Sequence, residues 1–236
     1  MTLNLWGANE WDHRRSAVVD WISDINPDLV ALQEVVQTES LGQASWLAER
    51  TGMTAVFGAA RTIDCGEYGN AALSRLPVHR SQCHLLTDAG TGNEPRAALT
   101  VDVDAHGHRI SFTSTHLSWQ FDEGWIREQQ VRDIAGVIGE HPIVCGDFNA
   151  TADSTEVRFM TGLPLVDAFD VAHPGEFGHT WSNANPFAAR EKEPDRRIDY
   201  IFVGAGQVRG ADVVCNEPRG GAWPSDHFGV AATLSL

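Results

Sequence analysis

Acid, amide and imidazole side chains follow several short apolar runs of this chain, and this pattern constrains the fold most. Near the C-terminus, Ser225-Asp226-His227 comes directly before the strand-like run 228–231. The same arrangement recurs at four other places: Leu32-Gln33-Glu34, Ser114-Thr115-His116-Leu117, Gly146-Asp147-Phe148-Asn149 and Arg197-Ile198-Asp199-Tyr200. We expect these five strand ends to converge into one metal-dependent hydrolytic centre.

The periodicity of apolar residues predicts strands interleaved with a few helices. Helices are expected over 11–25, 41–49, 122–138 and 153–160. Strands are expected over 2–6, 29–32, 71–74, 97–103, 110–116, 143–145, 198–203 and 230–234. A hairpin turn is expected at 104–107, and the longest loop is expected at 173–196, where a functional role is common. Hairpins outnumber βαβ crossovers, which indicates an α/β (α+β) fold of mixed sheets covered by helices.

The length of 236 residues favours one domain, 1–236, with a core that needs no disulfides. The formal net charge of −15 disfavours nonspecific binding to bulk nucleic acid. It does not exclude a phosphate ester at one site, because a carboxylate-bound metal reverses the local field. No apolar run is long enough to span a membrane, and no signal peptide opens the chain. We therefore expect a cytoplasmic monomer with no protein partner.

The four cysteines, Cys65, Cys83, Cys145 and Cys215, form no C-x-x-C pair. A structural zinc site is therefore not expected. Cys145 lies within an apolar run and is expected to be a small buried residue.

Hydrolysis of a phosphate ester requires neutralised phosphoryl oxygens, an activated water and a stabilised leaving oxygen. Mg²⁺ prefers oxygen ligands and keeps several waters, so one or two carboxylates suffice. Glu34 is the best candidate ligand, with Asp226 and the amide oxygen of Asn4 as helpers. Asp147 is suited to orient or deprotonate the attacking water, and Asn149 to hold that water and the phosphate.

Imidazoles titrate near neutrality, so His116 and His227 are candidate donors to phosphoryl oxygens. Asp199 is suited to fix the tautomer of His227 and keep it cationic. Strand alternation places Asp199 on the face opposite Ile198 and Tyr200.

Each of these residues also has a structural interpretation. Taken alone, Glu34 is interpreted as a surface carboxylate and His116 as a structural histidine. The segment 147–149 is interpreted as an Asx turn. Asp199 is able to pair with a neighbouring arginine, and Asp226 to form a turn. The functional interpretation rests on their joint recurrence at apolar strand ends.

Taken together, the motifs resemble the endonuclease/exonuclease/phosphatase superfamily, which has the deoxyribonuclease I-like fold. The matching strings, which span nearly the whole chain, are Thr2-Leu3-Asn4-Leu5-Trp6, Leu32-Gln33-Glu34-Val35, Gly69-Asn70-Ala71-Ala72-Leu73-Ser74-Arg75, Thr115-His116-Leu117, Gly146-Asp147-Phe148-Asn149, Arg197-Ile198-Asp199-Tyr200-Ile201-Phe202 and Ser225-Asp226-His227. The resemblance implies a four-layer sandwich of two mixed β-sheets packed face to face, with helices on both outer faces. It also implies phosphoester cleavage that depends on Mg²⁺ or Mn²⁺.

The resemblance also implies roles for individual residues. Asn4, Glu34 and Asp226 are expected around the metal. Asp147 and Asn149 are expected to act on water and phosphate. Asp199 is expected to orient His227, and His116 to contact the scissile phosphate or assist the leaving group.

The substrate remains open at this point. The candidate substrate-binding residues are Asn70, Arg96 and Trp181. Alternatively, Arg96 forms an ion pair on the surface and Trp181 is a buried anchor of its loop. The chain has no basic stripe and no long insertion. These features favour a small or single-stranded phosphodiester (a nucleotide or a single strand of nucleic acid among them), or a phosphomonoester, over processive cleavage of duplex DNA. A phosphomonoesterase for inositol or sugar phosphates and a noncatalytic binding module are the alternatives.

Overall fold

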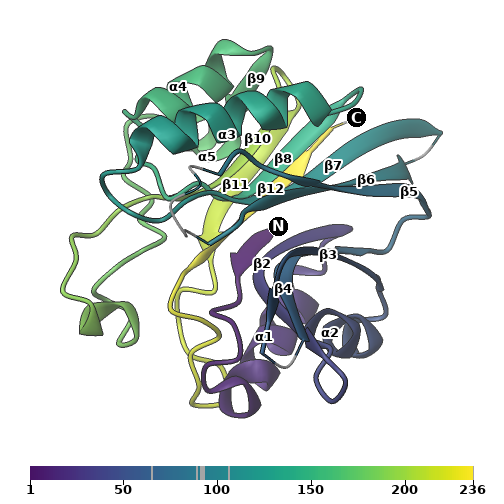
Figure 1. Ribbon diagram of the computed structural model, residues 1–236, viewed down its shortest axis with the longest axis vertical. Coiled ribbons are helices and arrows are strands. Elements are labelled where there is room, and N and C mark those ends of the chain that lie inside the picture. Colours follow the sequence, from purple (N-terminus) through teal and green to yellow (C-terminus); the bar gives the residue numbers. More distant parts are fainter. Residues whose placement is uncertain (65, 89, 91–93, 106, 236) are drawn as a thin grey trace.

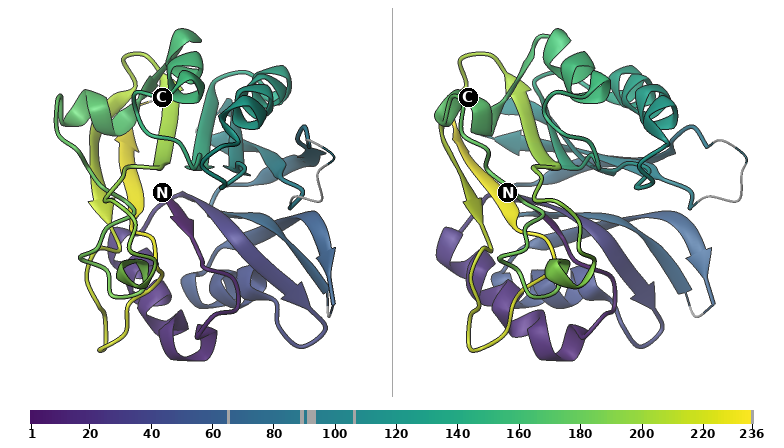
Figure 2. Two further views of the ribbon diagram at one scale, coloured as in Figure 1. Left: turned by 60° about the vertical axis from the view of Figure 1, so that its left-hand side comes forward. Right: turned by 90° about the vertical axis from the view of Figure 1, so that its left-hand side faces the viewer.

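Two six-stranded mixed sheets pack face to face in the computed structural model, which describes residues 1–64, 66–88, 90, 94–105 and 107–235. The first sheet has the order β11-β12-β1-β2-β4-β3 and the second the order β5-β6-β7-β8-β10-β9. Helices cover the outer face of each sheet, so four layers are visible in Figure 1 and in the turned views of Figure 2. The predicted four-layer sandwich is therefore confirmed.

The elements have the following bounds. The strands of the first sheet are β1 (Thr2–Asn4), β2 (Leu29–Thr38), β3 (Thr54–Ile63), β4 (Gly66–Ser74), β11 (Val208–Val214) and β12 (Gly229–Leu234). Those of the second are β5 (Val78–Leu85), β6 (Ala97–Ala105), β7 (His108–His116), β8 (Pro142–Asp147), β9 (Leu165–Asp167) and β10 (Asp199–Gly204). The helices are α1 (Trp11–Ile25), α2 (Gln43–Thr51), α3 (Gly124–Val137), α4 (Thr155–Gly162), α5 (Ala168–Ala172) and the 3₁₀ turn η1 (Ala188–Arg190).

Apolar side chains fill the spaces between the four layers. One buried cluster joins α1 and α2 to the first sheet, a second joins α3 and α4 to the second sheet, and a third lies between the sheets. The layer between the sheets also contains a polar bridge, in which Gln33 Nε2 donates to Ser114 Oγ at 3.1 Å. Thr2 Oγ1 donates to Gln33 Oε1 at 3.2 Å, so the amide of Gln33 is satisfied within the interior.

Local sequence explains where the main elements end. Helix α1 ends at Asn26, whose left-handed backbone (φ 49°) comes directly before Pro27. Helix α2 ends at Gly52 (φ 65°), a common terminating residue because it has no Cβ. Helix α4 begins after Ser154, whose side chain accepts a hydrogen bond from the Val157 amide at 3.2 Å.

Several strands are longer, and the strands are more numerous, than the apolar pattern predicts, although β1 ends at Asn4, two residues before the expected end at 6. The expected helix over 11–25 is confirmed, but β2 extends six residues past the expected end at 32. The sequence pattern missed β3, β5, β9, β11 and α5. Strand β5 is mostly exposed and lacks apolar alternation, so its pairing with β6 through the backbone is invisible to periodicity. Within the expected turn at 104–107, His106 lies outside the described residues.

Strand β2 contains an irregularity that positions one of the candidate ligands. Its pairing with β4 shifts register between Leu32 and Val35, and Glu34 lies in this gap with a left-handed backbone (φ 55°). Such a bulge redirects a side chain, and positive φ in a non-glycine residue is costly enough to need compensation. The side chain of Glu34 therefore does not follow the alternation between the two sheet faces that side chains of an ordinary strand show.

Two further sequence expectations concern the cysteines and the membrane. Cys145 is buried in β8, as expected, and Cys83 and Cys215 are free thiols. Cys65 lies outside the described residues. None of the helices in the described part of the chain has the length and apolar character needed to cross a bilayer.

Gly146 provides a test of how tightly the central strands of the second sheet are packed. A Cβ added to Gly146 (φ 154°) would lie 1.9 Å from the Thr115 carbonyl oxygen on β7, and that backbone atom has no freedom to move aside. We expect Gly146→Ala to lower the free energy of unfolding by about 3 kcal/mol or more. Gly136→Ala, in α3 with open space around it, is expected to be neutral or stabilising. Urea denaturation of both variants checks this, and equal losses would contradict it.

Candidate active site

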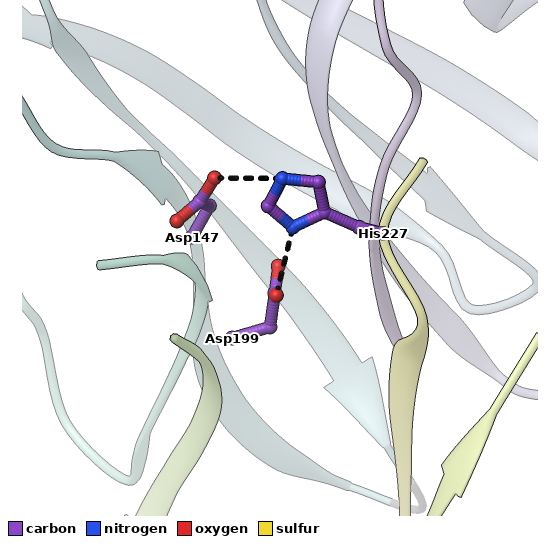
Figure 3. A group of neighbouring side chains, drawn as sticks. All are labelled: Asp147, Asp199 and His227. Carbon is purple, nitrogen blue, oxygen red and sulfur yellow. Dashed lines mark hydrogen bonds and ion pairs between the residues drawn. The ribbon is translucent and has the colours of Figure 1, made fainter. Parts of the chain in front are cut away.

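His227 lies between two buried aspartates, and this arrangement forms the centre of the candidate site (Figure 3). Its Nδ1 is 3.0 Å from Asp199 Oδ2, and its Nε2 is 3.7 Å from Asp147 Oδ2. Asp147 ends β8 and Asp199 begins β10, and the antiparallel register places the two residues directly opposite each other. His227 comes from the other sheet, from the segment just before β12. Segments far apart in the sequence therefore meet at the predicted position.

The charges around His227 decide its protonation state. Burial lowers the pKa of His227, but the carboxylates of Asp199, Asp147 and Asp226 and the hydrogen bond to Asp199 outweigh it. The result is a pKa well above the ordinary value of 6.5. A cationic imidazole donates from both ring nitrogens, which matches the two carboxylates that face it.

Several residues of the site contact the carboxylate of Asp147. Its Oδ1 accepts from the Asn149 amide at 2.9 Å, and its Oδ2 accepts from Asn4 Nδ2 at 3.0 Å. Burial is the main cause that raises the pKa of Asp147 to about 7, and the charge of Asp199 adds to it. A carboxylate with this pKa is suited to accept a proton near neutral pH.

His116 is held in the opposite protonation state from His227. Burial, the guanidinium of Arg96 and the charge of His227 lower the pKa of His116 well below its usual range. Arg96 Nη1 lies 3.2 Å from His116 Nδ1. Because arginine only donates, Nδ1 accepts, and the remaining ring proton is on Nε2. The protonated Nε2 faces Asp147 Oδ2, which accepts, at 3.5 Å. Asn149 Nδ2 is also only 3.1 Å from Nε2, but because both atoms carry protons it donates to the Leu117 carbonyl oxygen at 3.2 Å instead.

Asn4 joins two carboxylates. Its Nδ2 lies 3.2 Å from Glu34 Oε1 in addition to its bond to Asp147, and its Oδ1 accepts from the Trp6 amide at 2.9 Å. The β1–β2 pairing places Asn4 opposite Gln33, next to the irregularity that carries Glu34. The amide of Asn4 therefore links the predicted metal residue Glu34 with the predicted catalytic residue Asp147.

Asp226 is buried next to Glu34. Burial is the main cause that raises the pKa of Asp226 to about 6, and the charge of Glu34 raises it further, whereas those of His227 and Arg14 lower it. Ser225 Oγ is 3.1 Å from Asp226 Oδ1 and 2.6 Å from the Asn4 carbonyl oxygen. Ser225 thus ties the segment before β12 to β1.

Two groups of side chains compete as a metal site. The donor atoms of Asp147, Asp199 and His227 lie within 4.8 Å of one another. A protonated histidine, however, has no lone pair to give to a metal. Glu34 and Asp226 present oxygen donors of the kind that Mg²⁺ and Mn²⁺ take, and the charge of Glu34 raises the pKa of Asp226. The residues around Glu34 and Asp226 therefore fit a divalent cation better.

The predicted substrate-binding residues have distinct surroundings. Asn70 is buried and its Nδ2 donates to the Ala97 carbonyl at 2.7 Å, which links β4 to β6. Arg96 forms an ion pair, with its Nη2 3.3 Å from Glu94 Oε2, but at 4% exposure it is buried and not on the surface. The ring of Trp181 packs edge-on against His227 with centroids 4.9 Å apart. In Figure 1 the loop between α5 and β10 lies beside the segment that leads to β12, and Asn185 of that loop donates to the Ser225 and Asp226 carbonyl oxygens.

Arg14 is a site residue that the sequence interpretation missed. It is fully buried and donates to four backbone carbonyls, those of Asn9, Pro224, Trp6 and Gly7. Burial lowers the pKa of its guanidinium to about 10, while the charges of Asp226, Glu34 and Glu10 oppose that shift. The signal was present in the sequence, because position 14 is four residues before Val18 on the buried face of α1.

The pairing of His227 with Asp199 predicts a measurable shift. Asp199→Asn removes the nearest negative charge, so we expect the pKa of His227 to fall. NMR titration of the metal-free protein, followed at the histidine ring protons, measures this directly. Asp153→Asn removes an exposed carboxylate and serves as the control, for which no change at His227 is expected. An unchanged His227 titration in Asp199→Asn would show that Asp199 does not hold the imidazole cationic.

Comparisons with known proteins agree with this geometry. A sequence model of the Endonuclease/Exonuclease/phosphatase family matches residues 1–227. Mouse tyrosyl-DNA phosphodiesterase 2 is 26% identical over 240 residues, which cover 94% of this chain and 61% of the mouse protein. Carbon catabolite repressor protein 4 homolog 3 of Arabidopsis thaliana is 25% identical over 171 residues, covering 66% of this chain and 37% of the plant protein. This chain therefore spans less than two thirds of the length of these two relatives.

Solved structures extend the comparison to the fold. A protein of this family from Beutenbergia cavernae has a TM-score of 0.80 and 23% identity, covering all of this chain and 70% of that one. A humanized D. rerio TDP2 has a TM-score of 0.79 and 21% identity, covering 100% and 97% of the two chains. At this level of identity the likeness shows the fold alone. The match of the family model over residues 1–227 shows that the chain belongs to the endonuclease/exonuclease/phosphatase family.

Proposed function

We propose that this chain is a divalent-metal-dependent hydrolase that cleaves a phosphodiester. The observation that carries the proposal is the cationic His227 held between Asp199 and Asp147, next to the carboxylates of Glu34 and Asp226. The name of the mouse relative describes a phosphodiesterase, and a D. rerio TDP2 with 20% identity was solved with a single-strand DNA product. Both findings support a phosphodiester as the substrate class.

Glu34 and Asp226 are the residues that would hold Mg²⁺ or Mn²⁺, with Asn4 beside them. When bound, the cation supplies charge neutralisation of the phosphoryl oxygens and stabilisation of the leaving oxygen. The side chain of Asn4 keeps Glu34 and Asp147 at a fixed separation, since it donates to both. Arg14 anchors the surrounding backbone and partly balances the two carboxylates.

Asp147 is the proposed acceptor of the proton from the attacking water. As the bond between the water oxygen and phosphorus forms, the bond to the leaving oxygen breaks and the water proton passes to the carboxylate. The raised pKa of Asp147, about 7, makes it a better base than an ordinary aspartate. The Asn149 amide and Asn4 hold its two oxygens in place.

His227 and His116 are proposed to donate to different oxygens of the phosphoryl group. The cationic His227 stabilises negative charge as it develops, and Asp199 preserves its charge and orientation. The neutral His116 donates through Nε2, because Arg96 occupies Nδ1. Asn149 Nδ2 lies 3.1 Å from His116 Nε2 and donates to the Leu117 carbonyl oxygen, so this side chain borders the position proposed for the phosphate.

Removal of the central residues tests the assignment. We expect Asp147→Ala and His227→Ala each to lower the hydrolysis rate of bis-p-nitrophenyl phosphate by roughly 10²- to 10⁴-fold, because each removes a group that moves or stabilises charge. Asp153→Asn is the matched control and is expected to retain full activity. Unchanged rates in both alanine variants, at equal purity and with native circular dichroism, would refute the proposed roles.

The same assay distinguishes the substrate classes. We expect wild-type protein to hydrolyse the diester bis-p-nitrophenyl phosphate faster than the monoester p-nitrophenyl phosphate. Faster turnover of the monoester would favour a phosphomonoesterase. No turnover of either, combined with no calorimetric binding of Mg²⁺ or Mn²⁺, would favour a noncatalytic module.

Metal binding is expected to stabilise the protein in a pH-dependent way. Asp226 must lose its proton to bind a cation, and its pKa is raised to about 6 in the metal-free protein. The rise in melting temperature on adding Mn²⁺ is therefore expected to increase between pH 5 and pH 7.5. Glu34→Gln and Asp226→Asn are expected to lose most of this rise. Differential scanning calorimetry measures it, and an equal rise in both variants would place the cation elsewhere.

A further inference from the structure

Two exposed aromatic side chains lie directly beyond His116 and have no place in the proposed chemistry. Trp119 is 54% exposed and Phe121 is 63% exposed, in the segment that joins β7 to α3. We propose that these two rings form a stacking platform for a nucleobase next to the scissile phosphate of a single-stranded nucleic acid. The proposal rests on the phosphodiesterase function above and adds a binding subsite to it.

The backbone that carries the two rings is firmly held. Buried Arg127 donates from Nη1 to the carbonyl oxygens of Ser118 at 3.0 Å and Gln120 at 2.7 Å. Buried Gln130 accepts from the Ser118 amide at 3.0 Å and donates to Ser118 Oγ at 3.0 Å. Because α3 anchors the carbonyls on both sides of Trp119, the fold fixes the backbone that presents this ring to solvent. A backbone that is already ordered need not be ordered again when a base stacks on the ring.

The platform is connected to the catalytic centre from two directions. On one side, the Leu117 carbonyl accepts from Asn149 Nδ2 at 3.2 Å, and the Leu117 amide donates to the Asp147 carbonyl at 2.9 Å. On the other side, the guanidinium of Arg196 lies over the ring of Phe121, with Cζ 4.8 Å from the ring centroid. Arg196 pairs through its backbone with Trp181, and the ring of Trp181 contacts His227. The platform therefore lies beside the position proposed for the phosphate.

A base of a single strand fits this surface better than the other candidates. Stacking on an aromatic face needs no positive charge, so it suits a chain with a net charge of −15. The bases of a duplex are already stacked inside the helix, whereas those of a single strand expose both faces. An anionic lipid surface is disfavoured, because exposed Asp122 follows Phe121 directly. The guanidinium of Arg196, which is paired with Glu193, lies over the ring that the base would contact.

The test compares substrates that have or lack bases. Trp119→Ala and Phe121→Ala are each expected to lower kcat/KM for a short oligothymidylate roughly 5- to 150-fold. Neither variant should change kcat/KM for an oligomer of the same length built from abasic tetrahydrofuran units. Trp119→Phe is expected to retain most of the activity on oligothymidylate. Phe177→Ala removes an aromatic side chain of high exposure outside this segment and should leave both substrates unaffected.

Several outcomes would overturn the platform. Equal losses on both substrates, no loss on oligothymidylate, or the same loss in Phe177→Ala would each contradict base stacking. Sedimentation of the wild type with phosphatidylcholine vesicles, abolished in Trp119→Ala, would assign the rings to a lipid surface instead.

A binding measurement separates this inference from the proposed function. Fluorescence anisotropy of labelled oligothymidylate, measured in Ca²⁺, should show tighter binding by the wild type than by Trp119→Ala. If the wild type binds in this way but cleaves no phosphodiester, the platform stands and the hydrolase proposal fails. If it cleaves both oligomers and the variants bind as well as the wild type, the hydrolase stands and the platform fails.

Discussion

The burial of several carboxylates around one histidine is the constraint on which the rest of this structure depends. Asp147, Asp199 and Asp226 are all buried, and Glu34 is half-buried beside them. Buried charges that lack partners are expensive, so the fold must supply compensation close by. Charged His227, together with Arg14, supplies part of it. These four carboxylates exceed those two cations, which leaves an excess of negative charge suited to a divalent ion.

Neither sheet contains this site alone. The first sheet and the segments at its ends contribute Asn4, Glu34, Asp226 and His227. The second sheet contributes His116 at the end of β7, Asp147 at the end of β8 and Asp199 at the start of β10. Face-to-face packing, including the Gln33–Ser114 bond between the sheets, sets the distance between the two halves. Activity and the packing of the sandwich are therefore expected to depend on the same contacts.

The sequence was sufficient to predict which residues gather, because each lies within or next to an apolar run that had to become a strand. The apolar pattern indicated mixed sheets covered by helices, and the four layers came from the resemblance to a known family. The sequence did not predict the irregularity at Glu34, since a register shift depends on the pairing partner β4. The edge strand β5 was not predicted, because backbone pairing with β6 holds it in place and the periodicity of apolar residues does not report such pairing. The opposite protonation states of His116 and His227 depend on Arg96 and Asp199, whose proximity only the folded chain reveals.

The position of the bound metal decides which group of side chains forms the metal site. The two candidates are Glu34 with Asp226, and Asp147 and Asp199 with His227. The account predicts that a crystal grown with Mn²⁺ shows an anomalous diffraction peak within coordination distance of Glu34 and Asp226. It also predicts that His227 still bridges Asp199 and Asp147. A peak among Asp147, Asp199 and His227, or no peak at a Mn²⁺ concentration that supports hydrolysis, would contradict the account.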